Sequence, residues 1–397
     1  MQPLASKRTA ASLGAALAQL QAQQLRRERR TLSAHGTGRE LLAADGRVLI
    51  DFSSNDYLGL TRHPGLAAAL AAAAERCGTG AGASHLISGH GPEHERLEQE
   101  LAQFTGREAA LLFSTGYMAN LAVLTALAGR GQALLLDRLS HASLIDGARL
   151  SGGRVRRYAH ADAGAAATLA AAAPPALIAT DGVFSMDGDL APLPDLARTA
   201  HAHGAWLVVD DAHGLGVTGA RGGGTLEHYG LSQQQVPVLV GTLGKAFGSF
   251  GAFVAGSAQL IELLIQQARA YIYTTALPQP VAAASRAALA LIRSEGWRRQ
   301  RLGEHVARFR ARARERGLPL LESATPIQPL LAGSAAAALR MQQALTAAGF
   351  WVVAIRAPTV PAGRERLRVT LSATHTDAQV EALCTALAQA FERAQVS

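Results

Sequence analysis

The stretch VLVGTLGKAFGSFGAFVAGS (238–257) contains one cation, Lys245, among apolar, small and hydroxyl-bearing residues. The chain has 38 basic residues, and only two of them, Lys7 and Lys245, are lysines. Arginine stays protonated, whereas a desolvated lysine can lose its proton and then act as a base or form an imine. The sequence therefore indicates a reactive amine at position 245.

Two acids and a histidine follow a second apolar run, in WLVVDDAH (206–213). A carboxylate at the end of a buried strand is costly unless it is paired or hydrogen-bonded, which indicates a positively charged partner. A metal ion held by Asp210, Asp211 and His213 is the alternative. No second group of ligands completes such a site in the sequence. His141 follows another apolar run, and it becomes a candidate site residue only in combination with these residues.

A possible anion site lies in FSTGYMAN (113–120), where small and hydroxyl residues separate a predicted strand from a predicted helix. The first backbone N–H groups of a helix are free to hold a phosphate. An ordinary turn capped by Ser114 or Thr115 is the alternative interpretation. Thr242, three residues before the lysine, could add its hydroxyl. The glycine spacing of a P-loop is absent.

Apolar runs alternate with helical stretches along the chain, and the candidate site residues follow the ends of these runs. Such alternation predicts an α/β fold with a mainly parallel sheet, and ligands bind past the carboxyl ends of its strands. We expect an N-terminal helical arm over 1–50, a large domain over 51–285 and a smaller α+β domain over 286–397. The predicted strands of the large domain are 110–114, 133–137, 176–185, 206–213, 238–245 and 251–257.

Composition argues against several classes of protein. Cys77 and Cys384 have neither disulfide-framework nor metal-ligand spacing, so a reducing cytoplasm is expected. The net charge of +8 could suit a nucleic-acid binder, but the arginines are scattered and no aromatic residues interleave with them. No apolar stretch is long enough for a membrane anchor.

Together the lysine, the acid, the hydroxyls and the histidines describe a pyridoxal 5'-phosphate site. From about residue 25 onward the chain resembles the α-oxoamine synthases, which are fold-type I pyridoxal phosphate enzymes. The resemblance implies a mainly parallel seven-stranded sheet sandwiched by helices, a smaller C-terminal domain, and a homodimer. The motifs that carry it include DFSSNDYLGL, GTGAGASHLISGHGPEHERLEQELAQFTG, LLFSTGYMAN, SHASLIDGARLSG, DGVFSMDGDLAPL, VDDAHGLGVTGARGGG and GTLGKAFGSFGAFVAGS.

The resemblance also implies roles for single residues. Lys245 would hold the cofactor as a Schiff base, Asp210 would pair with its ring nitrogen, and His213 would hydrogen-bond its ring oxygen. His141 would stack on the ring and complete the catalytic set. The further residues implied are Gly116, Tyr117, Ser185 and Thr242 for the cofactor, and Asn55, Arg356, Thr359 and Arg29 for the substrates, with Arg26 as the alternative to Arg29.

The segment IRAPTVPAGRERLRVTLSA (355–373) suggests a branch of the family. It resembles the branch that joins L-alanine to a pimeloyl thioester, on coenzyme A or acyl carrier protein, in biotin biosynthesis. The implied activity is an acyl transfer with loss of carbon dioxide and the thiol. The alternative is another condensation of this family, such as that of glycine C-acetyltransferase. A silent scaffold protein is disfavoured because the lysine, the acid and both histidines are present.

Overall fold

The computed structural model describes residues 12–23, 25–36 and 38–395, so Lys7 lies outside the described residues. The chain forms two compact units. The larger unit contains residues 55–185 and 189–300, and the smaller unit contains 1–54, 186–188 and 301–397. The described N-terminal and C-terminal segments thus share the smaller unit, whereas the sequence suggested separate N-terminal and C-terminal parts.

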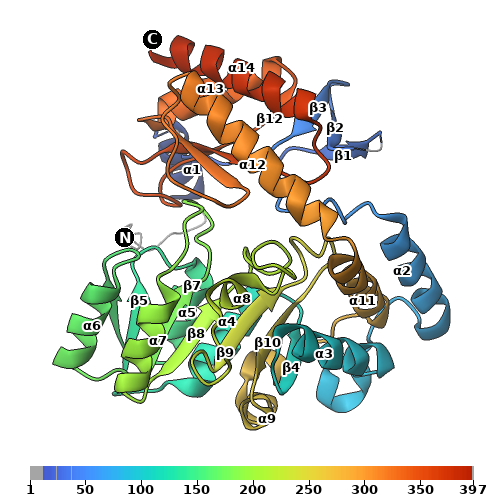
Figure 1. The fold of residues 1–397 in the computed structure, drawn as a ribbon, viewed down its shortest axis with the longest axis vertical. Helices are drawn as coiled ribbons and strands as arrows, with labels where there is room; N and C mark the ends of the chain where they lie inside the picture. The colour runs from blue at the N-terminus through green and yellow to red at the C-terminus, as the bar shows by residue number, and fades with distance from the viewer. Residues whose placement is uncertain (1–11, 24, 37, 396–397) are drawn as a thin grey trace. The chain divides into compact units, whose positions relative to one another are not determined.

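A seven-stranded sheet forms the centre of the larger unit (Figure 1). Its order is β4, β10, β9, β8, β7, β5, β6, and all neighbours are parallel except that β10 runs antiparallel to both β4 and β9. This confirms the predicted mainly parallel sheet of seven strands. The bounds are β4 Ala109–Phe113, β5 Ala133–Asp137, β6 Arg154–Tyr158, β7 Leu177–Asp181, β8 Trp206–Asp210, β9 Val238–Thr242 and β10 Ala252–Gly256.

The sequence analysis missed β6, whose sequence is RVRRY. The strand lies at the edge of the sheet and pairs only with β5, so part of it faces solvent. Arg154 and Arg157 are exposed, and only Tyr158 is fully buried. Charged residues suit an edge strand, and they remove the apolar run by which the central strands were recognised.

Helices cover the sheet (Figure 1). Helix α4 packs on β9 and β10, and α7 packs on β7 and β8. None of the described helices is both long and apolar enough to cross a bilayer. The helices of this unit are α2 Pro64–Cys77, the π-helix η2 His85–Gly89, α3 Pro92–Thr105, α4 Gly116–Leu127, α5 Ala142–Leu150, α6 Ala163–Ala172, α7 Leu193–Ala202, α8 Gly224–Tyr229, α9 Ala258–Gln267, α10 Arg269–Ile272 and α11 Gln279–Ser294.

Polar residues end the central strands. Asp181, Asp210 and Thr242 are the last residues of β7, β8 and β9. Since β4 and β9 both run antiparallel to β10, β4 also ends at this edge, and Gly116 of α4 follows three residues later. The sheet therefore brings carboxylates, hydroxyls and a helix N-terminus to one edge, as expected for a ligand site.

The smaller unit contains two sheets, ordered β1-β2-β3-β12 and β11-β14-β13. The helical arm expected over 1–50 is wrong in part: among the described residues of this range α1 is the only α-helix, and three antiparallel strands follow it, separated by turns at Gly36 and Gly46, which have positive φ. Helix α12, Trp297–Glu315, starts in the larger unit and ends here. The other elements are α1 Leu13–Ala22, β1 Leu32–His35, β2 Glu40–Ala43, β3 Val48–Asp51, β11 Ile327–Leu331, α13 Ala335–Ala347, β12 Phe350–Trp351, β13 Val353–Ile355, β14 Arg366–Thr370 and α14 Asp377–Gln395.

A half-buried histidine joins two loops at the strand ends of the larger unit. His160 contacts Asp137 through Nδ1 at 3.0 Å and Asp189 through Nε2 at 2.9 Å, with its ring edge against Phe184. Burial alone would lower the pKa of His160, but the two carboxylates outweigh burial and raise it to about 10. The imidazole is therefore charged near neutral pH.

We expect His160→Ala to lower the free energy of unfolding by about 3 kcal/mol, because the mutation leaves the buried Asp137 without its cation. The pKa is raised, so this contribution is complete below the unfolded value of 6.5 and is lost as pH rises through about 10. Urea unfolding at a series of pH values would measure it. The exposed His228→Ala is the matched control. If the free energies of unfolding of wild type and His160→Ala differ by the same amount at every pH, the ionic role of His160 is contradicted.

Candidate active site

Lys245 lies at the start of a chain of polar contacts in the larger unit. Its Nζ is 2.8 Å from Nε2 of His213, and Nδ1 of His213 is 2.6 Å from the hydroxyl oxygen of Tyr57. That hydroxyl also donates to Oδ1 of Asn55 at 3.3 Å. When Lys245 donates to Nε2 of His213, Nδ1–H of His213 can donate to Tyr57 and Tyr57 to Asn55. With Lys245 as the donor, the contacts follow one consistent direction of donation, with the His213 proton on Nδ1.

Asp210 is buried at the end of β8 and accepts two hydrogen bonds. Nδ2 of Asn120 donates to Oδ2 at 2.6 Å, and the backbone N–H of Ala212 donates to Oδ1 at 3.0 Å. No cation forms an ion pair with this carboxylate within the described part of the chain. Asn120 sits on α4 and was missed by the sequence analysis, because an asparagine in a helix carries no pattern of its own.

The neighbouring Asp211 turns away from Asp210 into its own loop. Its Oδ2 accepts the backbone N–H of Thr225 at 2.7 Å, and burial raises its pKa to about 7. A Cβ at Gly224, whose φ is +84°, would lie 1.9 Å from that oxygen. The loop therefore closes around Asp211, and the two adjacent acids do not present a shared pair of metal ligands.

His141 follows β5 and is held from two sides. Its backbone N–H donates to Oδ2 of Asp181 at 2.9 Å, and its Nδ1 lies 2.7 Å from Oγ of Ser143, which also accepts from Asn120. Burial, followed by the nearby Asp210 carboxylate, raises the pKa of Asp181 well above its usual value. His141 is thereby connected to Asp210 through Ser143 and Asn120.

The predicted phosphate residues lie around the start of α4 and the end of β9. Thr115 caps α4 by accepting from Met118 N at 3.2 Å, so the capping interpretation of this turn is correct in itself. The Tyr117 hydroxyl donates to Asp146, and Thr242 donates to Gly251 O at 3.1 Å and accepts from Gly244 N. Ser185 is half-buried in the loop after β7.

Two predicted substrate residues of the smaller unit, Arg356 and Thr359, both interact with Arg27. Arg27 donates to Oγ1 of Thr359 at 3.2 Å. Burial, and next the charge of Arg27, lower the pKa of Arg356. Arg29 and Arg26 are exposed. Sequence spacing favoured Arg29, and it overlooked Arg27 because the four arginines of LRRERR cannot be ranked by residue type.

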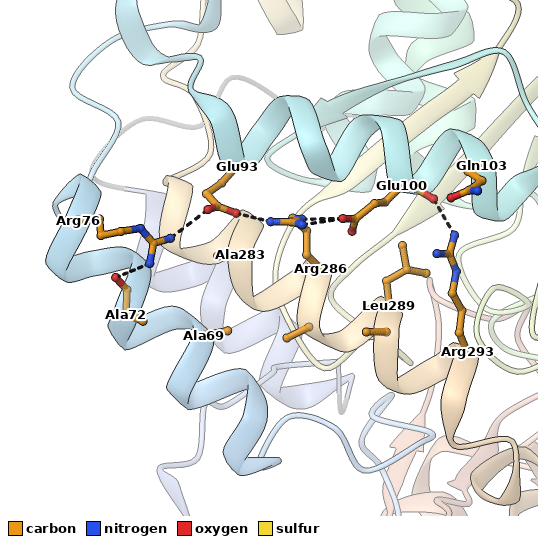
Figure 2. Close-up of a pocket in the computed structure, with 12 residues that line it drawn as sticks. Ala69, Ala72, Arg76, Glu93, Glu100, Gln103, Ala283, Arg286, Leu289 and Arg293 are labelled. Atoms are coloured by element: carbon orange, nitrogen blue, oxygen red, sulfur yellow. Dashed lines mark hydrogen bonds and ion pairs between the residues drawn. The ribbon is translucent and has the colours of Figure 1, made fainter.

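A surface pocket of the larger unit contains none of these residues. Figure 2 shows it between α2, α3 and α11, where Arg286 bridges Glu93 at 2.8 Å and Glu100 at 2.7 Å, and Arg76 donates to Glu93 at 3.0 Å. These charges pair with one another and tie the three helices together. The pocket therefore belongs to the scaffold and not to the site at the strand ends.

The residues at the strand ends fit pyridoxal phosphate. Lys245 supplies an amine, Asp210 a buried carboxylate, and α4 an N-terminus where a Cβ on Gly116 would meet no atom within 4 Å. Oδ1 of Asn120 is buried and has no hydrogen-bond partner among the described residues. An amine, a carboxylate and a helix N-terminus match the carbonyl, ring nitrogen and phosphate of this cofactor.

Comparison with known proteins identifies the family. The sequence pattern described as aminotransferase class I and II matches residues 47–387. The chain belongs to the aminotransferase class I and II family. It is 56% identical over 380 residues to 8-amino-7-oxononanoate synthase of Cellvibrio japonicus, covering 95% of each chain, and 58% identical over 374 residues to that of Thioalkalivibrio sulfidiphilus, covering 94% and 95%.

Solved structures agree with this assignment. A serine palmitoyltransferase from S. paucimobilis with a bound PLP–myriocin aldimine superposes with a TM-score of 0.92 at 31% identity, covering 98% of this chain and 100% of that one. An 8-amino-7-oxononanoate synthase from Francisella tularensis gives 0.78 at 31% identity, covering 87% and 98%. The predictions of an α-oxoamine synthase, of fold type I and of pyridoxal phosphate as the cofactor are confirmed.

Proposed function

We propose that this chain catalyses the decarboxylative condensation of L-alanine with a pimeloyl thioester, the reaction of 8-amino-7-oxononanoate synthase in biotin biosynthesis. The observation that carries the proposal is 56–58% identity to synthases of that name over almost the whole of both chains. The acyl carrier is coenzyme A or acyl carrier protein. We also retain the proposals of a homodimer and of a cytoplasmic location.

The cofactor end of the reaction would use the residues at the strand ends. Bound pyridoxal phosphate supplies an electron sink for negative charge at the α carbon of the amino acid. Lys245 would hold it, Asp210 would keep its ring nitrogen protonated, and His213 would form a hydrogen bond with its ring oxygen. The phosphate contacts would come from the backbone of Gly116 and Tyr117 and from Thr242, with His141 and Ser185 against the ring.

Proton transfer at the α carbon would use the amine of Lys245. His213 Nε2, 2.8 Å from Nζ, fixes where this amine points, and Tyr57 and Asn55 hold the imidazole in turn. A base positioned by such a chain contributes about 100-fold to 10,000-fold in rate. Asn120 would act as a positioning residue, since it donates to Asp210 and, through Ser143, reaches His141.

Two carboxylates of the substrates need cations. We propose Arg356 for the carboxylate of alanine, because a planar guanidinium matches it with two donors. The far carboxylate of pimelate would meet an arginine of the segment 26–30. Spacing in the sequence favours Arg29. The hydrogen bond from Arg27 to Thr359, a further predicted substrate residue, supports Arg27.

We expect Arg27→Ala to raise the Michaelis constant for the pimeloyl thioester about 10-fold to 100-fold, with alanine binding unchanged, because one charged hydrogen bond is worth roughly 1.5–3 kcal/mol. Arg29→Ala and Arg26→Ala form the matched series. Arg356→Ala should instead weaken alanine binding, measured from the cofactor spectrum before any thioester is added. If all three N-terminal variants keep wild-type kinetics, this segment does not bind the acyl substrate.

Thiol release tests the proposed substrates directly. Alanine and glycine would each be offered with pimeloyl-CoA and with acetyl-CoA, and the four specificity constants compared. The proposal expects alanine with pimeloyl-CoA to exceed the other pairs. A preference for glycine with acetyl-CoA would favour glycine C-acetyltransferase activity and overturn the proposal.

A further inference from the structure

Three histidines of the larger unit converge outside the candidate active site. His85 belongs to the π-helix η2, His90 follows it, and His94 lies in the first turn of α3, which Figure 1 labels. One ligand nitrogen from each ring lies within 4.8 Å of the other two. Nδ1 of His85 and Nδ1 of His90 are 3.0 Å apart.

The three rings are already oriented by other contacts. His94 donates from Nε2 to Leu277 O, so Nδ1 of this neutral ring carries a lone pair, which accepts the N–H of Gly91 at 3.0 Å. Nε2 of His90 lies 3.4 Å from a carboxylate oxygen of Glu95. His85 is buried and stacks on Tyr271, with ring centroids 5.0 Å apart.

We propose that His85, His90 and His94 bind one divalent transition-metal ion through their three Nδ1 atoms. Metal-bound histidines generally donate their other ring N–H to a carboxylate or a backbone carbonyl, and Glu95 and Leu277 offer these acceptors to His90 and His94. Two nitrogens on one tetrahedral zinc ion, at about 2.0–2.1 Å each, are about 3.3 Å apart. The observed 3.0 Å between His85 and His90 is close to that spacing.

Zinc is the favoured ion for this set of ligands. Imidazole suits zinc, nickel and copper, whereas calcium and magnesium prefer oxygen ligands. His90 is exposed, which gives the ion access from solvent, while His85 and His94 are buried. On Nδ1 of His94 the ion would take the place of the hydrogen bond from the Gly91 N–H, and it would link η2 to α3. A direct Nδ1–H to Nδ1 hydrogen bond between His85 and His90 is the competing arrangement without metal.

Binding of Zn²⁺ to the untagged, cofactor-loaded protein tests the proposal. After treatment with a chelator, titration calorimetry should give one zinc ion per chain, and the thermal midpoint should rise with zinc concentration. His90→Ala, which changes an exposed side chain, should weaken zinc binding at least about 10-fold, and Glu95→Gln by about 10-fold. His228→Ala, another exposed histidine, should bind zinc like the wild type.

A spectroscopic measurement keeps the test independent of folding defects. Co²⁺ in place of zinc should give the absorption of a tetrahedral site in the wild type and lose it in His85→Gln and His90→Ala, while the cofactor spectrum stays unchanged. Absence of binding to the wild type would overturn the proposal. Equal binding to His90→Ala and His228→Ala would overturn it as well, because the ion would then be held elsewhere.

Discussion

Lys245→Arg should abolish covalent attachment of the cofactor and reduce turnover to background. Arginine keeps the positive charge, and this chain accepts arginine at almost every other basic position, so charge and solubility are preserved. A guanidinium cannot readily form the imine or act as the base near neutral pH. Borohydride reduction followed by mass measurement of the intact protein should show the cofactor on the wild type and not on the variant.

The sequence offers a matched control for this experiment. Lys7→Arg changes the only other lysine in the chain, so it should leave both cofactor attachment and turnover as in the wild type. Retained turnover in Lys245→Arg would remove this lysine from the mechanism. Loss of attachment in both variants would point to a general effect of removing lysine.

Asp210→Asn should lower turnover by about 100-fold or more while the protein still retains the cofactor. The replacement has the same shape, so the phosphate contacts elsewhere persist, but a neutral amide cannot hold the ring nitrogen protonated. The new asparagine side chain would also lie beside Nδ2 of Asn120, which donates to Oδ2 of Asp210 at 2.6 Å in the wild type. Turnover and cofactor content measured on the same samples would separate chemistry from binding.

Asp211→Asn distinguishes the two adjacent acids. Asp211 contacts the loop at Thr225 and not Asn120, so its replacement should change stability and leave the cofactor spectrum near that of the wild type. Normal turnover in Asp210→Asn together with loss of turnover in Asp211→Asn would show that Asp211, and not Asp210, pairs with the ring nitrogen.

The central sheet could be predicted from the sequence because its inner strands are apolar on both faces. Leu177 to Asp181 of β7 are all buried, and the strand starts with the apolar run LIA before its polar end, as a strand covered on both faces favours. Strand β6 and strands β1 to β3 escaped prediction for the opposite reason. They are edge or surface strands, and their exposed residues remove the apolar run.

Residues of the candidate site could be predicted where an unusual residue type stands out from its surroundings. A lone lysine and an acid after an apolar strand stand out in the sequence, and Lys245 and Asp210 both lie at the strand ends. The supporting residues Asn120, Tyr57 and Arg27 were missed. They join the candidate site through contacts across 90, 156 and 332 positions of the chain, and no local pattern encodes such contacts.

Mass spectrometry of the product formed from isotopically labelled alanine tests the central claim most directly. With pimeloyl-CoA, the account predicts 8-amino-7-oxononanoate that keeps the nitrogen, the α carbon and the methyl carbon of alanine, while the carboxyl carbon leaves as carbon dioxide. Thiol release without a labelled condensation product would mean simple thioester hydrolysis. That result, or a product that retains the carboxyl carbon of alanine, would contradict the proposed decarboxylative condensation.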